Sequence, residues 1–143
     1  MQTDRTLPVA VCAAVIFHQG KILLTRRPED KLLGGFWEFP GGKLDERESP
    51  HAALVRELRE ELDIEITVGP ILETVYHHYP WGNALILAYR CAWQSGVIKH
   101  LEVADHRWVT AEELNDYDIL PADEPIIARL QALDKAAQAD PKE

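Results

Sequence analysis

The sequence predicts an α/β fold of the α+β type, in which helices pack on the faces of one mixed sheet. Two observations support this prediction. Strand-like and helical segments follow one another along the chain, without an internal repeat, a low-complexity block or a linker. The chain has 143 residues, 46% of them hydrophobic, which suits one globular core of ordinary domain size. We therefore expect residues 1–143 to form a single domain.

The first third of the chain is rich in extended segments that are separated by turn residues. Apolar and β-branched side chains predict a buried strand, and a short turn after it predicts a hairpin. Proline and paired glycines further on predict a loop. The expected segments are strands at 9–17 and 21–25 about a turn at 18–20, a loop at 26–35, and a short extended piece at 36–39 that Pro40, Gly41 and Gly42 end.

The strongest helical signal follows this loop region. Ser49 suits the N-cap position, and Pro50 suits the first helical position because its missing N–H would be unpaired there anyway. Val55, Leu58 and Leu62 then fall on one side at helical spacing. We predict a helix from about residue 50 to residue 62.

The second half of the chain predicts a long hairpin, a short strand and two helices. Thr110 and Glu113 form a capping box that opens the first, short helix. The expected segments are a strand-like run at 64–79 interrupted at Gly69 and Pro70, a turn at 81–83, strands at 84–93 and 103–109, a loop at 116–122, a helix at about 124–137 that buries Ile126, Ile127, Leu130 and Leu133, and a frayed tail at 140–143.

Charge and composition restrict the partners of the protein. A net charge of −9 without a basic patch argues against nucleic acid as a partner, so an anionic substrate would need bound cations to offset the repulsion. No apolar run approaches the roughly 20 residues that span a bilayer, and residues 1–8 lack the features of a signal peptide. For Cys12 and Cys91 we favour two buried free thiols in a reducing cytoplasm over a disulfide. We expect a cytoplasmic protein without membrane partners, either a monomer or a homodimer.

Three glutamates share one face of the first predicted helix. Glu57, Glu60 and Glu61 stand at i, i+3 and i+4, so their carboxylates converge. Like charges at this spacing destabilise a helix by roughly 0.2–0.5 kcal/mol per pair. Divalent cations among them would account for the arrangement, because Mg²⁺ takes oxygen ligands and keeps positions open for phosphate oxygens. The alternative is a solvated acidic face braced by Arg56 and Arg59, and the helix alone favours neither.

The glycine loop ahead of this helix favours the metal interpretation. Gly41 and Gly42 allow the backbone to approach a metal or a phosphate closely. Arg56 can pair with Glu48 across the junction of loop and helix and hold it in shape.

The segment 42–64 resembles the Nudix box, in which a glycine, five residues, a glutamate and seven further residues precede Arg-Glu-apolar-any-Glu-Glu-any-Gly-apolar. The matching residues are Gly42, Glu48, Arg56, Glu57, Leu58, Glu60, Glu61 and Ile64. Asp63 departs from the pattern, because it stands where the family has a glycine that ends the helix in a left-handed conformation. Aspartate tolerates that conformation better than most residues, so we expect a small cost in stability and intact chemistry.

The resemblance extends to MutT-type nucleoside triphosphate pyrophosphohydrolases through residues 25–27, 37–43, 79–80 and 120–126. It implies the Nudix fold, an α-β-α sandwich with a mixed sheet between helices. It also implies hydrolysis of a nucleoside triphosphate to a monophosphate and pyrophosphate, as house-cleaning of nucleotides such as 8-oxo-dGTP or cytidine nucleotides, with a link to DNA repair. Two alternatives are a Nudix hydrolase of ADP-ribose or a nucleotide sugar, and a non-catalytic binding module. Degenerate domains usually lose the box glutamates, which are present here, so the module ranks last.

The resemblance further implies a catalytic metal site and a proton acceptor. Mg²⁺, or alternatively Mn²⁺, would be held by the side chains of Glu57, Glu60 and Glu61 and by the carbonyl of Gly41. Glu102, six residues before Trp108, holds the place of a more distant ligand. For the carboxylate that takes the proton from water, Glu57 is the first choice and Glu102 the second. Arg56 belongs to the same catalytic group.

The substrate contacts follow from the same resemblance. Arg27 and Lys43 are expected phosphate contacts, although either could be a solvated surface charge. Tyr79 is the expected stacking platform for the base, with Phe39 lining the pocket, although core packing is a rival role for both. Asp123 is expected to contact the base edge, and Glu38 is a weaker candidate. We interpret His77 and His78 as structural or rim residues, and the four tryptophans as core or hairpin packing.

Overall fold

Strand β1 (Val9–His18) lies at the centre of the fold and is buried on both faces. Ile16 packs on one side with residues of helix α1 (Pro50–Leu62), and Val15 packs on the other with residues of helix α2 (Glu124–Ala139). A strand that is covered on both faces has no position for a polar side chain, which explains why this run is almost continuously apolar.

The protein is described by a computed structural model that covers residues 7–139, and within them seven strands form one mixed sheet. The sheet runs in the order β3-β2-β1-β6-β5, with β4 paired to β1 and β7 paired to β2. Strands β1 and β6 are parallel, and the other pairs are antiparallel. The remaining strands are β2 (Lys21–Arg26), β3 (Trp37–Glu38), β4 (Gly41–Lys43), β5 (Glu65–Tyr79), β6 (Gly82–Ser95) and β7 (Asp105–Val109).

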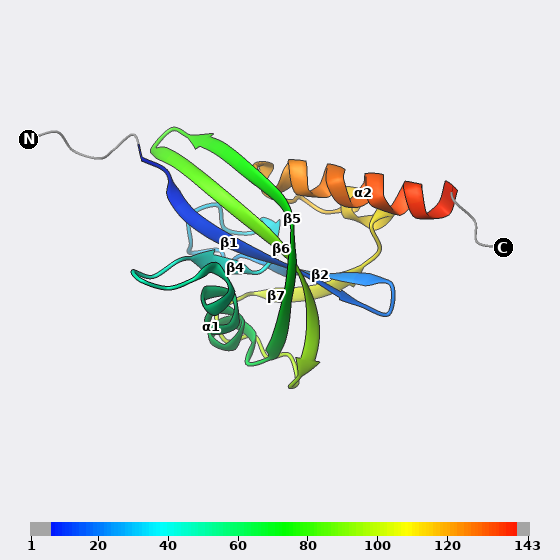
Figure 1. Ribbon diagram of the computed structural model, residues 1–143. Coiled ribbons are helices and arrows are strands. Elements are labelled where there is room, and N and C mark those ends of the chain that lie inside the picture. The colour runs from blue at the N-terminus through cyan, green and yellow to red at the C-terminus, as the bar shows by residue number, and fades with distance from the viewer. Residues whose placement is uncertain (1–6, 140–143) are drawn as a thin grey trace, which may run out of the picture.

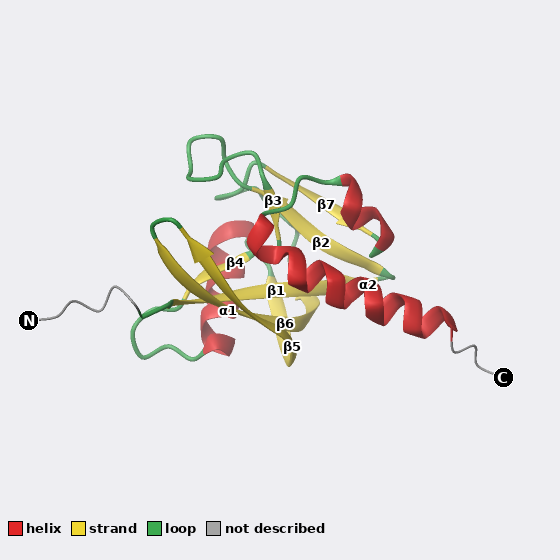
Figure 2. Ribbon diagram, turned by 90° about the horizontal axis from the view of Figure 1, so that it is seen from above, coloured by secondary structure: helices red, strands yellow, loops and turns green. Residues whose placement is uncertain are grey.

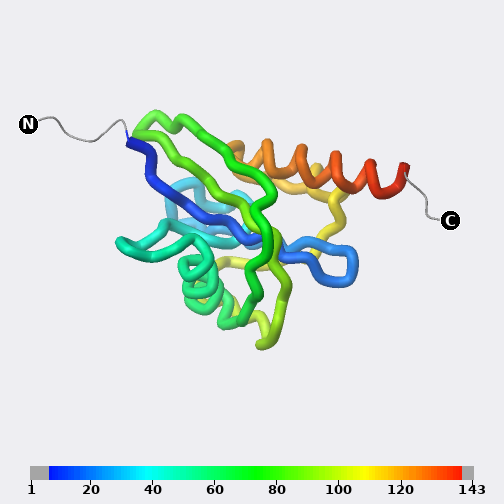
Figure 3. The backbone as a smooth tube through the Cα atoms, viewed as in Figure 1, coloured from blue at the N-terminus to red at the C-terminus, as the bar shows by residue number. Residues whose placement is uncertain are grey.

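Helices cover both faces of this sheet, which confirms the predicted fold class. Figures 1 and 2 show α1 and α2 on opposite sides of the sheet, and two clusters of buried residues fill the two layers between them. Figure 3 follows the chain through the long ribbon of β5 and β6 beside β1. Two short 3-10 helices, Glu112–Asp116 and Pro121–Asp123, lead into α2.

Local capping residues set the ends of α1 as predicted. The side-chain oxygen of Ser49 accepts a hydrogen bond from the backbone N–H of Ala52 at 3.1 Å. At the other end Asp63 adopts the left-handed conformation, with φ 58° and ψ 40°, and its N–H bonds to the carbonyl of Arg59 at 3.0 Å. Asp63 therefore takes the conformation expected of the glycine that it replaces.

Two predicted boundaries in the strand regions are wrong or incomplete. Gly41 and Gly42 do not merely end a strand, because they form β4 and pair with Ala13 and Cys12 of β1. A side chain at Gly41 would collide with the carbonyl of Cys12, so glycine is what permits this close pairing. The predicted interruption at Gly69 is a shift of register within a continuous β5.

The C-terminal helix is longer than predicted and ends at Ala139 instead of about residue 137. Ile126 and Leu130 are buried as expected, whereas Leu133 is 38% exposed. Leu133 borders a surface hollow that Phe17, Ile22 and Leu130 also line, so one side of it stays open to solvent. The tail predicted at residues 140–143 lies outside the described residues, as do residues 1–6.

Two smaller predictions are confirmed. Thr110 and Glu113 exchange backbone-to-side-chain hydrogen bonds of 2.9 and 3.2 Å, which is the reciprocal pattern of a capping box. Cys12 and Cys91 are buried free thiols, and burial raises the pKa of Cys12 to about 11 and that of Cys91 to about 12.

No helix within residues 7–139 is both long and apolar enough to cross a membrane.

Candidate active site

Arg56 fastens the glycine loop to helix α1. Its Nε donates to Glu48 Oε2 at 2.7 Å and its Nη2 donates to Glu48 Oε1 at 3.0 Å, so the pair is bidentate. Nη2 also donates to the backbone carbonyl of Lys43 at 3.1 Å. This is the contact predicted between Arg56 and Glu48, and its fork geometry gives the junction a defined shape.

The three glutamates of α1 differ in their surroundings. Glu57 and Glu60 each accept a hydrogen bond from Nη1 of Arg56 at 3.2 Å. The side chain of Glu57 is 14% exposed, whereas that of Glu60 is 47% exposed and lies at the rim. Arg59 does not brace this face, because it pairs with Glu65 at 2.6 Å.

Burial and mutual repulsion raise the pKa values of the inner carboxyls. The pKa of Glu57 is raised mainly by burial. The pKa of Glu61 is raised well above its ordinary range by burial first, and then by the negative charges of Glu38 and Glu57. Carboxyls held this close favour sharing a proton or a cation over ionising together.

Gly42 makes room for this group. A Cβ atom at position 42 would lie 2.5 Å from a carboxylate oxygen of Glu57, so any side chain there would displace that carboxylate. The glycine loop and the acidic helix are therefore in direct contact, and glycine at position 42 leaves the Glu57 carboxylate in its place.

A polar cleft of about 190 Å³ opens beside these carboxylates. Glu61 from α1 and Glu102 from the loop before β7 meet there, although they are distant in the sequence. The backbone N–H of Glu102 bonds to the carbonyl of Glu61 at 3.3 Å, which holds the loop against the helix end. The residues lining the cleft are Arg27, Pro28, Lys31, Glu38, Gly41, Glu61, Glu102 and Val103.

The donor atoms of this cleft suit a hard divalent cation. Glu61, Glu102 and Gly41 are among the residues that line it, and Glu57 lies next to Glu61. Mg²⁺ prefers oxygen ligands of this kind, and a cation would relieve the repulsion that raises the carboxyl pKa values. The residues therefore fit the metal that the sequence suggests.

A second, largely apolar cavity of about 240 Å³ adjoins the cleft. Its walls come from β1, the glycine loop, the β5–β6 hairpin and the turn before α2. Among the residues that line it are Arg27, Glu38, Phe39, Gly41, Lys43, Tyr79, Trp81 and Asp123. The six expected substrate-contact residues, from Arg27 to Asp123, thus share one cavity.

Asp123 is the buried polar group of this cavity. Only 5% of the residue is exposed, and its Oδ2 accepts a long hydrogen bond of 3.4 Å from the backbone N–H of Phe39. Burial raises the pKa of Asp123 to about 7, and the negative charge of Glu38 adds to the effect. Near neutral pH the carboxyl is therefore present both protonated and ionised. Phe39 itself is 3% exposed and belongs to the core, so it contributes its backbone as well as its packing.

Tyr79 stands at the mouth of the cavity as part of an aromatic stack. Its ring lies 4.7 Å from that of Trp81 with an interplanar angle of 12°. Trp81, at the tip of the hairpin, is 59% exposed. Trp81 thus lines the cavity, which goes beyond the hairpin packing that the sequence analysis expected. The sequence feature that could have identified Trp81 as a cavity residue is its position in a turn, where packing gives no reason for a tryptophan.

Arg27 and Glu38 form the wall between the two cavities. Nη1 of Arg27 lies 3.3 Å from each carboxylate oxygen of Glu38, and Nε donates to the carbonyl of Leu32 at 2.8 Å. Arg27 was expected to meet phosphate, and the structure shows it already engaged with a carboxylate. Lys43 lines the apolar cavity, and Lys31, which the sequence analysis missed, lines the acidic cleft.

The predicted rim histidines lie outside both cavities. Nδ1 of His78 lies 2.7 Å from Oδ1 of Asn83 across the hairpin, and the ring of His77 packs edge-on to Tyr79. Their side chains point to opposite faces of β5, as alternation along a strand requires.

The NUDIX domain family matches residues 11–129. The CTP pyrophosphohydrolase of Escherichia coli (strain K12) is 40% identical over 135 residues, which cover 92% of this chain and 98% of that protein. The 8-oxo-dGTP diphosphatase of the same organism is 33% identical over 116 residues, which cover 81% and 90%. The solution structure of the E. coli ORF135 protein superposes with a TM-score of 0.78 at 36% identity and covers 98% of this chain and all of that chain.

Proposed function

This chain belongs to the NUDIX domain family of hydrolases, and we propose that it hydrolyses nucleoside triphosphates to nucleoside monophosphates and pyrophosphate. Members of this family generally use divalent metal ions, and we propose Mg²⁺ for this chain, with Mn²⁺ as a substitute. We also propose that residues 1–143 act as one domain, with the box at 42–64 as its catalytic segment.

The observation that carries the proposal is the junction of two cavities with different chemistry. The apolar cavity with Asp123 and Tyr79 suits a nucleobase, and the cleft with Glu61 and Glu102 suits a polyphosphate accompanied by cations. Gly41 lines both, so a nucleotide could lie across it with its base on one side and its phosphates on the other.

Each residue would then have a definite task. Glu57 would accept the proton of the attacking water, because it is a largely buried carboxylate held next to the cleft by Arg56. Arg56 would position Glu57 and the glycine loop through its bonds to Glu48. Tyr79 would stack on the base and Asp123 would bond to its edge. Divalent cations, when bound, would offset the negative charge of the triphosphate and of the departing pyrophosphate.

The substrates named for relatives suggest the biological role. One relative is named for CTP and another for 8-oxo-dGTP. We propose that this chain removes oxidised or modified nucleotides of these two kinds from the cytoplasmic pool, which would link it to the avoidance of DNA damage. No nucleic-acid partner is needed for this role, and it is compatible with a monomer or a homodimer.

A panel of nucleotides with Mg²⁺ tests the proposed reaction. The panel includes dCTP, CTP, 8-oxo-dGTP, dGTP, ADP-ribose and a nucleotide sugar, and pyrophosphate and orthophosphate are measured separately. We expect pyrophosphate with the monophosphate, and the largest kcat/KM for a cytidine triphosphate or 8-oxo-dGTP. Stepwise release of orthophosphate, or a preference for ADP-ribose, would contradict the proposal. Glu61→Gln serves as the inactive control.

A further inference from the structure

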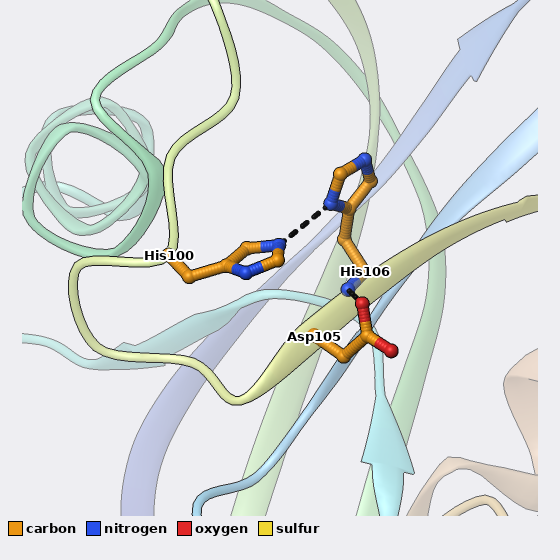
Figure 4. Close-up of side chains that lie close together, drawn as sticks. All are labelled: His100, Asp105 and His106. Carbon is orange, nitrogen blue, oxygen red and sulfur yellow. Dashed lines mark hydrogen bonds between the residues drawn. The ribbon is translucent and has the colours of Figure 1, made fainter.

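Two histidines and an aspartate lie close together outside the acidic cleft. His100 lies in the loop that follows β6, whereas Asp105 and His106 are the first two residues of β7 (Figure 4). Nε2 of His100 and Nδ1 of His106 are 2.8 Å apart, and the two rings meet edge-on at 5.1 Å. One ligand atom from each of the three residues lies within 4.8 Å of the other two.

The carboxylate of this group is held in place by its neighbours. Oδ1 of Asp105 accepts the backbone N–H of His106 at 2.8 Å, and Oδ2 lies 2.7 Å from Nη1 of Arg107. The guanidinium also donates to the carbonyl of His106 at 2.8 Å. These contacts fix the start of β7, and each carboxylate oxygen keeps a second lone pair for a ligand.

We propose that His100, Asp105 and His106 form a binding site for one first-row transition-metal ion of the Zn²⁺ type, separate from the acidic cleft. Imidazole nitrogens favour such ions over Mg²⁺, which takes oxygen ligands. Two nitrogens on a tetrahedral Zn²⁺ at 2.0–2.1 Å would stand about 3.3 Å apart, so the present pair needs to widen by about 0.5 Å. The Asp105 oxygen, which lies within 4.8 Å of both nitrogens, needs to move toward the ion. His100 is exposed, which leaves the fourth position open to water.

The position of the site gives the ion a structural consequence. His100 and His106 stand on either side of Glu102 in the sequence, and the loop between them is held to α1 through the carbonyl of Glu61. An ion bound by both histidines would tie the loop to β7 at a point close to Glu102. Binding of the ion does not depend on the proposed function, because only the side chains of His100, Asp105 and His106 are needed for it.

Calorimetric titration of the untagged protein with Zn²⁺ tests the proposal. An excess of Mg²⁺ is present throughout to occupy the acidic cleft. We expect one Zn²⁺ per chain, with the affinity at least tenfold weaker in His100→Ala and in His106→Ala. His77→Ala is the matched control, because this histidine also packs against an aromatic ring but lies on the distant hairpin. Glu61→Gln should bind Zn²⁺ as the wild type does.

The outcomes separate the proposal from its rivals. No binding, or equal affinity in His100→Ala and wild type, would overturn it. Loss of binding in Glu61→Gln alone would place the ion in the acidic cleft and would also overturn it. Cys12 and Cys91 do not confuse the result, because both thiols are buried and remain protonated.

Tryptophan fluorescence supplies a second readout that needs no activity. His106 and Trp108 line the same surface hollow together with Trp93. Cu²⁺ bound at His106 should therefore quench the fluorescence of the wild type, and His100→Gln should require at least tenfold more Cu²⁺ for the same quenching. His100→Gln keeps a polar side chain at an exposed position, so its folding is not at risk. Quenching that is the same in both proteins would contradict the site.

Discussion

Asp123 illustrates how one buried side chain can decide what a cavity binds. An ionised carboxylate only accepts hydrogen bonds, whereas a protonated one also donates. With a pKa of about 7, Asp123 is largely protonated below neutral pH and largely ionised above it. The ionised form suits the exocyclic amine of cytosine, and the protonated form can donate to O6 of an oxidised guanine.

Asp123→Asn should therefore change base preference, because an amide both donates and accepts at every pH. An unpaired buried polar group costs roughly 1–3 kcal/mol, so relative kcat/KM should shift toward 8-oxo-dGTP by about tenfold to a hundredfold. In the wild type, the ratio of kcat/KM for 8-oxo-dGTP to that for dCTP should fall as pH rises from 6 to 8. In Asp123→Asn that ratio should stay nearly constant. A ratio unaffected by both the substitution and pH would show that Asp123 does not touch the base.

The box glutamates should be required for turnover but not for folding. Loss of one metal ligand should cost several kcal/mol of transition-state stabilisation, so Glu57→Gln, Glu60→Gln and Glu61→Gln should each lose roughly a thousandfold or more in kcat with Mg²⁺. Circular dichroism should stay unchanged. Glu65→Gln is the control, because its carboxylate pairs with Arg59 away from the cleft. Near-normal turnover of the Glu60 and Glu61 variants would rule out the metal-site interpretation.

Tyr79 should act on the base and not on the phosphates. Stacking on an aromatic face is worth roughly 1–3 kcal/mol per base, so Tyr79→Ala should weaken nucleotide binding by about tenfold to a hundredfold. Hydrolysis of a base-free polyphosphate ester should change much less. The measurement compares KM and kcat for both substrates. Equal losses would mean that Tyr79 serves the fold, for instance by supporting Trp81.

At the scale of the elements, helix α1 shows how a substitution within a motif is tolerated. Asp63 is left-handed, and its carboxylate lies 3.2 Å from Lys99 in an exposed pair. Glycine has no steric cost in this conformation, whereas an exposed ion pair contributes little. Asp63→Gly should therefore raise the free energy of unfolding by about 0.5–1 kcal/mol. Urea unfolding measures this, Lys99→Ala isolates the ion pair, and a loss of stability in Asp63→Gly would contradict the argument.

Elements that are determined by residues adjacent in the sequence were predicted well. Elements that are determined by contacts with distant parts of the chain were not. The ends of α1 follow from Ser49 and Asp63, which are adjacent to the helix they cap. Strand β4 depends on pairing with β1, about 30 residues away, so no local signal could have revealed it. Likewise, Leu133 shares the helical spacing of Ile126 and Leu130 but borders a surface hollow beside Phe17 and Ile22, which the pattern of α2 alone does not show.

The same distinction holds for the site as a whole. The pair of Arg56 and Glu48 was predictable, because both belong to one motif. Lys31 and Trp81 were missed, because they reach the cavities only once the loop and the hairpin have folded over them. The salt bridge between Arg27 and Glu38 was not predicted for a related reason. The sequence suggests that Arg27 could bind phosphate. It does not show that Glu38, on a neighbouring strand, already pairs with the guanidinium of Arg27.

For the molecule as a whole, the carboxyl groups buried around the cavities lower the free energy of unfolding when they ionise. The pKa values of Glu38, Glu57, Glu61 and Asp123 are all raised, with burial as the largest cause. A carboxyl with a raised pKa in the folded state stabilises the fold fully below its unfolded pKa. That contribution is lost as pH rises through the folded pKa. The metal-free protein should therefore lose stability between about pH 4 and pH 8, and divalent cations should restore part of it.

Asp123 allows this cost to be measured for a single group. Its pKa rises from the ordinary value of 3.8 to about 7, so ionising it in the folded protein at pH 8 costs up to roughly 4 kcal/mol. Asp123→Asn cannot ionise and avoids that cost. Urea unfolding in the presence of a chelator gives the free energy of unfolding of both proteins at pH 5 and pH 8. The variant should gain stability relative to the wild type by a few kcal/mol as pH rises. A difference that is the same at both pH values would mean that Asp123 titrates normally, and the pH-dependent base preference argued for it would fail as well.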